Sequence, residues 1–393
     1  MIDTATALQL VLSHGTSKGK TMEVTLNDAL GFVLYDDVIS PMDMPPFRQS
    51  AMDGYAVNAN GADWYRLVGE VQAGAAHQPK LATGEAVRIF TGAAVPDSAT
   101  AVIMQEKVAV NGQQLRLEIP WAPEMNIRPQ GEQIKKDAVA MSNGTLIQGA
   151  HIGFLAGLGI TKVKVRQKPS IAIVVTGNEL VSPGTPLPYG KIYESNGAML
   201  QATLNELGYK NTSIVRIADD YEDTKRVLQE TISTVDVVVI TGGVSVGDYD
   251  FVGKALLAIG VEQIFHKVKQ KPGKPLFFGR KEGTSIFGLP GNPGAALNCF
   301  YIYVYPLLRN FQGAEAVELP SVQVPLLSDY TVNGDRAQFL KAKMHGAGVE
   351  ILDGQSSAMV RAFGYANALV FLPEDSTKIN KGELVKTILL PHQ

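Results

Sequence analysis

Three segments of the chain combine glycine with polar residues directly after an apolar run. They are VVTGNEL (174–180), TGGVSVGDYD (241–250) and GLPGNP (288–293). Glycine lets backbone amides approach an oxyanion without a Cβ collision, and a following helix adds free amides. Ligands of open parallel sheets bind beyond the carboxyl ends of the strands. The segments therefore predict a phosphate site, with tight strand-to-helix turns as the alternative. The candidate residues are Thr176, Gly177, Gly242, Gly243, Ser245 and Gly247.

Acidic residues lie beside these turns. Glu179 follows the first turn, Asp248 and Asp250 close the second, and Asp219 and Asp220 follow the run SIVRI. Mg²⁺ is held in proteins by one or two carboxylates together with phosphate oxygens. Such a set of carboxylates could therefore hold a Mg²⁺ ion. A helix N-cap is the alternative for each aspartate, especially for Asp219 and Asp220.

A run of lysines follows in HKVKQKPGKP (266–275). Lys267, Lys269 and Lys271 alternate, so a continuous strand would place them on one face. The neighbouring prolines stiffen the segment and would fix the directions of Lys271 and Lys274. Such a group suits a second oxyanion beside the phosphate, whereas a solvated edge is the alternative.

A second group of candidates lies in the first half of the chain. Asp53 precedes Gly54, Thr91 precedes Gly92, and Arg128 is a possible bidentate ligand of an oxyanion. Taken alone, Asp53 suits a hairpin turn and Arg128 suits an ordinary surface position.

From residue 170 onward, short β-rich runs alternate with helical segments. Strands are expected at 171–175, 212–217, 236–240 and 262–268, and helices at 196–208, 221–234, 250–259 and 293–310. This alternation predicts a three-layer α/β domain with a mostly parallel sheet.

The remaining segments lack that alternation. Residues 1–35 look helical, 45–140 look irregular and β-rich, and the runs after 318 suggest a small β-barrel-like domain. The fold class expected is multidomain α/β plus β. The predicted domains are 1–44 with 141–168 (helical and linker), 45–140, 169–312 and 313–393.

Composition narrows the functional class. The net charge of −3 gives no general attraction to nucleic acid or anionic lipid, and the single cysteine, Cys299, excludes an intrachain disulfide or a CxxC metal site. The start of the chain lacks the pattern of a signal peptide, and no apolar run is long enough to span a bilayer. We expect a cytoplasmic protein without nucleic-acid or membrane partners.

Taken together, the motifs resemble those of the molybdopterin molybdenumtransferase family. SAMDGYAV, RIFTGAAVP, VVTGNEL, TGGVSVGDYDF, KPGKP and GLPGNP occur in the order found in that family. The resemblance implies a homodimer whose active site is shared between subunits. It implies an enzyme that inserts molybdenum from molybdate into adenylylated molybdopterin and releases AMP.

The resemblance also assigns residues to roles. Catalytic positions would be Asp53, Glu179, Asp219, Asp250, Lys267 and Lys271, and substrate-binding positions would include Thr91, Arg128, Pro290, Pro293 and Ser357. Lys274, from the lysine run, is expected to bind substrate as well. Mg²⁺ on Asp250 and Glu179 would polarise the anhydride. The chain departs from the family at Gln133, where many members carry an acid, so either Glu132 replaces that acid or it is dispensable.

Three alternatives stay open. The α/β part also resembles molybdopterin adenylyltransferase, which would leave the remaining length unexplained. The receptor-clustering scaffold gephyrin contains a domain of the same family, but its fused domain and long linker have no counterpart here. The sequence does not separate molybdate from tungstate as the substrate.

Overall fold

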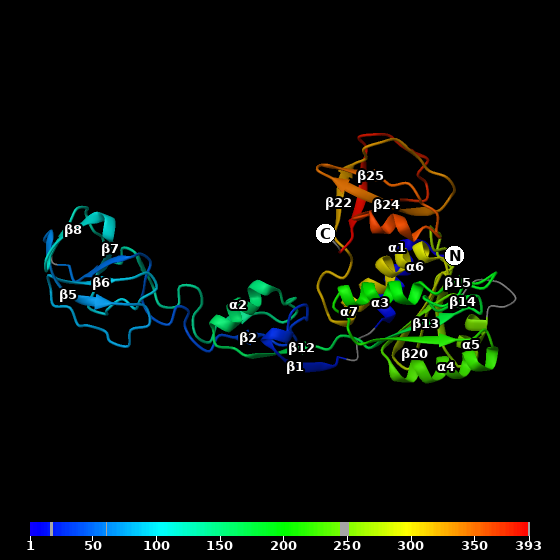
Figure 1. Cartoon of the computed structure of the whole chain (residues 1–393), viewed down its shortest axis with the longest axis horizontal. Helices are drawn as coiled ribbons and strands as arrows, with labels where there is room; N and C mark the ends of the chain where they lie inside the picture. Colours follow the sequence, from blue (N-terminus) through cyan, green and yellow to red (C-terminus); the bar gives the residue numbers. More distant parts are fainter. Residues whose placement is uncertain (16–18, 60, 244–250, 392–393) are drawn as a thin grey trace. The chain divides into compact units, whose positions relative to one another are not determined.

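The computed structural model of the chain describes residues 1–15, 19–59, 61–243 and 251–391. Contacts divide the chain into two compact units. Unit 1 comprises residues 1–22, 31–33 and 165–393, and unit 2 comprises residues 23–30 and 34–164. Unit 1 contains a sheet covered by helices and a second sheet, and unit 2 is mainly β-structure (Figure 1). The coarse expectation of a multidomain α/β plus β protein is therefore confirmed.

The central sheet of unit 1 has six strands. In spatial order they are β16 (Thr212–Ile217), β13 (Ile171–Thr176), β17 (Val237–Thr241), β21 (Thr284–Leu289), β20 (Phe277–Lys281) and β18 (Glu262–His266). The first four run parallel, and β20 and β18 are antiparallel to their neighbours. Because β13 and β17 are buried on both faces, they read as continuous runs of Val and Ile.

Helices cover both faces of this sheet, as Figure 1 shows for α3 and α4 on opposite sides of β13. They are α3 (Asn196–Glu206), α4 (Tyr221–Thr234), α5 (Phe251–Ala258), α6 (Pro293–Cys299) and α7 (Tyr305–Phe311). Ile173 and Val175 of β13 pack with α3 and the α6–α7 segment, whereas Val174 packs with α4 and α5. Successive strand residues thus serve opposite layers.

Two helical expectations need correction. The segment expected as one helix at 293–310 contains a π-helical turn, η3 (Phe300–Val304), between α6 and α7. A helix over 1–35 is wrong beyond His14, because α1 (Thr4–His14) ends there and β1 (Thr21–Thr25) follows. β1 pairs with β12 (Lys162–Arg166), a partner too distant in sequence for local patterning to reveal.

A second sheet of unit 1 is built mainly from the last part of the chain. Its strands are β19 (Gln270–Lys271), β24 (Ala337–His345), β26 (Ala368–Leu372), β28 (Leu384–Leu389) and β22 (Ser321–Pro325), with β25 (Gly348–Ile351) beside β24. The smaller elements are β14 (Leu180–Val181), β15 (Ile192–Tyr193), β23 (Tyr330–Thr331), β27 (Lys378–Ile379) and η4 (Val360–Gly364). Because β19 pairs with β24, the lysine run is held against the C-terminal residues.

Unit 2 contains a six-stranded sheet. Its order is β7 (Ala101–Met104), β4 (Gly54–Val57), β6 (Glu85–Ile89), β5 (Trp64–Val71), β9 (Gln114–Leu117) and β8 (Val108–Asn111). Ala56 and Val87 face one apolar cluster, and Tyr55 and Ala86 face another. Its remaining elements are η1 (Leu26–Asp28), β2 (Val38–Ile39), β3 (Gln49–Ser50), η2 (Gln105–Lys107), β10 (Ile127–Arg128), β11 (Val139–Met141) and α2 (Gly149–Gly157).

Candidate functional site

The loops that follow β13, β17 and β21 meet at a hollow of about 550 Å³. Gly242 has a φ of +87°, and a Cβ there would lie 2.8 Å from the carbonyl oxygen of Thr176. A Cβ on Gly291 would lie 3.7 Å from the Cα of Gly242. The residues around the hollow include Thr176, Thr241, Gly242, Pro290, Gly291 and Pro293. Glycine at 242 is therefore what lets three strand ends approach each other.

Two other predicted glycines lie near this hollow. Gly243 has a φ of +61°, and a Cβ there would lie 2.6 Å from Cγ2 of Val252 in α5. Gly177 has a φ of +143° and lines a neighbouring hollow of about 240 Å³. The candidates Ser245, Gly247 and Asp250 lie outside the described residues.

The acidic candidates occupy different settings. Glu179 is exposed and lines the 550 Å³ hollow, and a Cβ on Gly177 would lie 2.6 Å from its Oε1. Asp219 Oδ2 accepts a hydrogen bond of 2.8 Å from the backbone N–H of Asn178. Asp220 accepts one of 2.8 Å from the N–H of Asp223, so it is the N-cap of α4. The N-cap alternative therefore holds for Asp220, whereas Asp219 joins two loops.

Mg²⁺ would have few protein ligands among the described side chains. No group of three or more His, Cys, Asp and Glu in that part of the chain is placed to hold a metal ion. The 550 Å³ hollow nevertheless offers the carboxylate of Glu179. Glu194 also lines this hollow but is buried, and its Oε1 accepts a hydrogen bond from the N–H of Gly197. One exposed carboxylate, that of Glu179, is compatible with Mg²⁺, which commonly keeps waters and takes its other ligands from substrate phosphates.

A basic hollow of about 380 Å³ adjoins the glycine-lined one. The two share Pro275, Pro290 and Asn292 as lining residues. Lys271 and Lys274 line the basic hollow together with Arg336, which the sequence reasoning missed. Arg336 Nη1 donates to the carbonyl oxygen of Gln270 at 3.3 Å. A basic residue just before β24 was the available signal, but only the β19–β24 pairing reveals its neighbours.

Ser357 also lines the basic hollow and is tied to the loop after β21. Its hydroxyl accepts a hydrogen bond of 2.8 Å from Nδ2 of Asn292. Its carbonyl oxygen accepts one of 3.0 Å from the N–H of Ala295. The C-terminal segment thus forms one wall beside the GLPGNP loop.

The expectation that Lys267, Lys269 and Lys271 share a strand face is wrong. Lys267 has a φ of +76°, so the strand is interrupted after β18. Lys269 forms an ion pair with Glu374. Of these three lysines, Lys271 lines the basic hollow and Lys267 lines none of the hollows described above.

The candidates in unit 2 form their own group. Asp53 Oδ1 accepts hydrogen bonds of 2.7 Å from both the backbone N–H and the hydroxyl of Thr91. These two bonds, the backbone one first, hold the pKa of Asp53 below its ordinary value. Arg128 pairs with Gln49, whose Nε2 donates to the carbonyl oxygen of Gly92 at 3.1 Å. The three candidates therefore lie around the Thr91–Gly92 turn.

Glu132, the acid that could replace the one missing at Gln133, follows Arg128 closely in the sequence. Glu132 and Gln133 are both exposed, in the segment that follows β10. The replacement of the missing carboxylate by Glu132 therefore stays a prediction.

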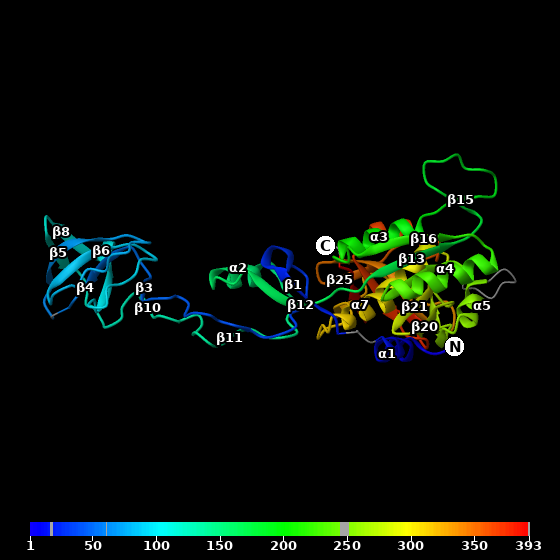
Figure 2. The ribbon, with the colours of Figure 1, turned by 90° about the horizontal axis from the view of Figure 1, so that it is seen from below.

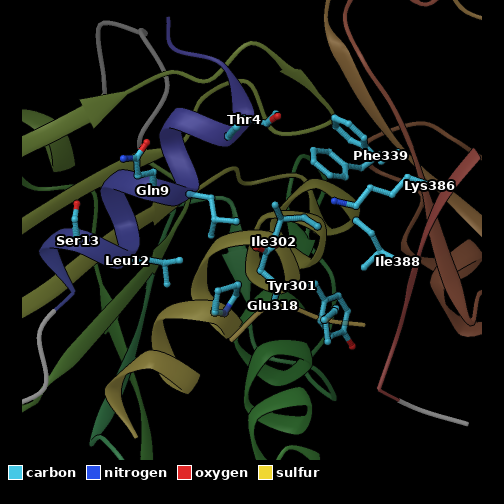
Figure 3. A pocket seen from close by; sticks show the side chains of 15 residues that line it. Thr4, Gln9, Leu12, Ser13, Tyr301, Ile302, Glu318, Phe339, Lys386 and Ile388 are labelled. Carbon is cyan, nitrogen blue, oxygen red and sulfur yellow. The ribbon is translucent and has the colours of Figure 1, made fainter. Parts of the chain in front are cut away.

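A larger hollow of about 690 Å³ lies elsewhere in unit 1. Figure 3 shows Thr4, Gln9 and Leu12 of α1 on one side and Phe339 and Lys386 on the other. Its lining is largely apolar and includes no glycine turn. We therefore place the candidate site at the two adjoining hollows, since they gather the groups suited to oxyanions.

No helix in the described ranges is both long and apolar enough to cross a bilayer.

Comparison with family models covers most of the chain. The "MoeA N-terminal region (domain I and II)" matches residues 2–159, the "probable molybdopterin binding domain" matches 172–310, and the "MoeA C-terminal region (domain IV)" matches 323–390.

Individual proteins agree with these matches. A molybdopterin molybdenumtransferase of Staphylococcus aureus is 32% identical, over 98% of this chain and 94% of its own. One from Staphylococcus epidermidis is 31% identical, over 94% and 91%. A crystal structure of a molybdopterin biosynthesis MoeA protein from Pyrococcus horikoshii is 30% identical, covers 99% of this chain and 100% of its own, and has a TM-score of 0.86.

Proposed function

Because the chain belongs to the molybdopterin molybdenumtransferase family, we propose that it inserts molybdenum from molybdate into adenylylated molybdopterin and releases AMP. The observation that carries this proposal is the pair of adjoining hollows, one lined by glycine turns and one by Lys271, Lys274 and Arg336. A phosphoanhydride in the first and an oxyanion in the second would lie side by side.

The glycine-lined hollow would hold the phosphates of the substrate. Thr176, Gly177, Gly242 and Gly243 lie at the ends of β13 and β17, where free backbone amides favour anions. The proposal extends to Ser245 and Gly247, which follow in the sequence segment TGGVSVG. Pro290 and Pro293 would shape the opposite wall.

The basic hollow would hold molybdate. Lys271 and Lys274 offer ammonium groups, and Arg336 offers a planar fork that matches two oxygens of an oxyanion. Ser357 would add a hydroxyl. Lys267 belongs to the lysine run expected to bind this second oxyanion, but it does not line the basic hollow, which favours Arg336 for this role.

The Mg²⁺ proposal rests on the donor chemistry of the first hollow. Glu179 would be one ligand, and Asp250 is proposed as the second. When bound there, the ion would supply positive charge to the phosphoanhydride. Asp219 would act indirectly, because its carboxylate orients the Asn178 loop next to Glu179.

We further propose that the protein is a cytoplasmic homodimer. Asp53, Thr91 and Arg128 of one copy would complete the active site of the other copy. Four domains are proposed, namely 1–44 with 141–168, 45–140, 169–312 and 313–393, although α1 from the first of these packs within unit 1. Mixing the inactive variants Asp53→Ala and Asp250→Ala tests the shared site, because mixed dimers would regain one intact site. Failure to regain activity, with exchange of subunits demonstrated, would refute it.

The activity itself is tested with purified protein, adenylylated molybdopterin, Mg²⁺ and molybdate. Molybdate-dependent AMP release, together with product that reconstitutes a molybdenum-dependent apoenzyme, is the expected result. ATP-dependent adenylylation of molybdopterin instead would identify an adenylyltransferase. Binding of a partner protein without either activity would favour a scaffold. A lower requirement for tungstate than for molybdate would identify tungstate as the substrate.

A further inference from the structure

One wall of the glycine-lined hollow has no role in the proposal above. It is the segment 192–196, Ile192-Tyr193-Glu194-Ser195-Asn196, which ends β15 and begins α3, and all five residues line the hollow. Two of them are polar side chains that unit 1 buries. Glu194 is 5% exposed and Asn196 is 9% exposed.

Glu194 presents a hydrogen-bond acceptor. Its Oε1 accepts a hydrogen bond of 2.6 Å from the backbone N–H of Gly197, in the first turn of α3. A carboxyl group has two oxygens, so one such bond to Oε1 leaves acceptor capacity free. No lysine or arginine is among the residues that line the same hollow.

Asn196 presents a second acceptor, and its orientation follows from its neighbour. Its Nδ2 donates to the carbonyl oxygen of Gly291 at 2.8 Å. Because a carbonyl only accepts, the amide nitrogen must face Gly291, which turns Oδ1 the other way. Oδ1 is buried and has no hydrogen-bond partner among the described residues. A buried acceptor without a partner costs free energy, so it indicates a group that a ligand would satisfy.

The chemical pattern of the two acceptors discriminates between the rings of the proposed substrate. The pyrimidinone edge of a pterin carries adjacent donors, the N3–H and the 2-amino group. Adenine instead presents its amino donor beside a ring-nitrogen acceptor. Two acceptors therefore match the pterin edge and would repel the ring nitrogen of adenine.

The same wall offers an apolar surface. Ile192 is 56% exposed and Tyr193 is 42% exposed, and both line the hollow. The hydroxyl of Tyr193 donates to the carbonyl oxygen of Thr185 at 2.8 Å, within the loop that joins β14 to β15. That loop extends away from the sheet in Figure 2. A fixed aromatic ring suits the face of a flat heterocycle.

We propose that segment 192–196 is the pterin-recognition wall of this site. Glu194 and Asn196 accept hydrogen bonds from the 2-amino-pyrimidinone edge, and Tyr193 packs against the ring. This inference rests on the proposed function, since it specifies how the molybdopterin half of the substrate is held. It also places AMP outside this wall.

The first test uses the wild-type protein and small probes. Equilibrium binding is measured for 6-hydroxymethylpterin, for the corresponding lumazine, in which an oxygen replaces the 2-amino group, and for AMP. We expect the pterin to bind about tenfold or more tightly than the lumazine, because an acceptor would then face the Glu194 carboxylate. Equal affinities would overturn the proposal without any mutation.

The second test uses Glu194→Gln, which keeps the shape of the side chain and an oxygen for Gly197. Its preference for pterin over lumazine should fall to about two-fold or less, with affinity for AMP unchanged. Glu315→Gln, at an exposed position, is the matched control and should keep the preference. If Glu194→Gln weakens AMP as much as pterin, or loses its melting transition, Glu194 is only a structural cap of α3 and the proposal fails. Selective loss of AMP binding would assign the wall to adenine instead.

The third test addresses the ring. Tyr193→Phe should keep pterin affinity within about two-fold, whereas Tyr193→Ala should weaken it about tenfold. Equal pterin affinities of these two variants would show that the ring of Tyr193 does not contact the pterin. Molybdate-dependent turnover is measured separately. Turnover without pterin discrimination would refute only this inference, and discrimination without turnover would refute only the proposed activity.

Discussion

Gly294 joins α6 to the C-terminal wall of the basic hollow. It is the second residue of α6 and has an ordinary helical φ. A Cβ at this position would lie 2.8 Å from the carbonyl oxygen of Ser357. Gly294→Ala is therefore a way to displace Ser357 without touching a charged side chain.

The size of the effect follows from this contact. Ordinary Cβ contacts begin at 3.4 Å, so the Ser357 carbonyl oxygen must retreat by about 0.6 Å from Gly294, which is itself buried. Overpacking of this kind costs about 1–3 kcal/mol, and replacing a helical glycine by alanine returns at most about 1 kcal/mol. We expect a loss of up to about 3 kcal/mol in unfolding free energy. Because a 1 Å misplacement can cost about a hundredfold, we also expect a roughly tenfold higher molybdate requirement.

The assay is AMP release as a function of molybdate concentration, with urea unfolding in parallel. Gly153→Ala in α2 is the matched control, because no atom lies within 4 Å of its added Cβ. That control should gain up to about 1 kcal/mol in stability. A Gly294→Ala protein with an unchanged molybdate requirement would show that the Ser357 segment does not form part of the anion site.

The other predictions concern single side chains. Arg336→Ala should raise the molybdate requirement at least as much as Lys271→Ala, and Arg336→Lys should have an intermediate effect. The measurement is AMP release as a function of molybdate concentration. An Arg336→Ala protein with an unchanged molybdate requirement would exclude Arg336 from the anion site. Thr91→Val removes the hydroxyl donor but keeps the backbone N–H, so the pKa of Asp53 should rise partway toward its ordinary value in a carboxyl NMR titration. Burial lowers the pKa of Lys168 to about 8 from 10.5. The unfolded chain therefore binds more protons between these values, so wild-type stability should increase from pH 8 to pH 10 relative to Lys168→Met, measured by urea unfolding.

Local patterning was sufficient for much of the α/β part of unit 1. The strands around Ile173 and Val239 are buried on both faces, and that burial requires the continuous β-branched runs seen in the sequence. Glycines after β17 were recognisable because a positive φ beside another backbone excludes other residues. These features depend on neighbours within a few residues.

Features that depend on distant partners were not predictable in the same way. β1 was expected to be helical because its partner β12 lies far along the chain. The lysine faces were misassigned because one residue, Lys267, adopts a positive φ. Arg336 was missed because its place beside Lys271 comes from the pairing of β19 with β24. Glu194 and Asn196 appear significant only once their burial and hydrogen bonds are known.

The packing of α1 has a consequence for biosynthesis. Ala7 and Val11 of α1 are buried in the same apolar cluster as Leu307, and Nδ2 of Asn310 donates to the carbonyl oxygens of Leu12 and Gly15. Because α1 precedes unit 2 in the sequence and α7 follows it, α1 is synthesised long before the residues against which it packs. Until α7 has been made, Ala7 and Val11 lack these partners, and apolar surface that is exposed in this way during synthesis is prone to aggregation.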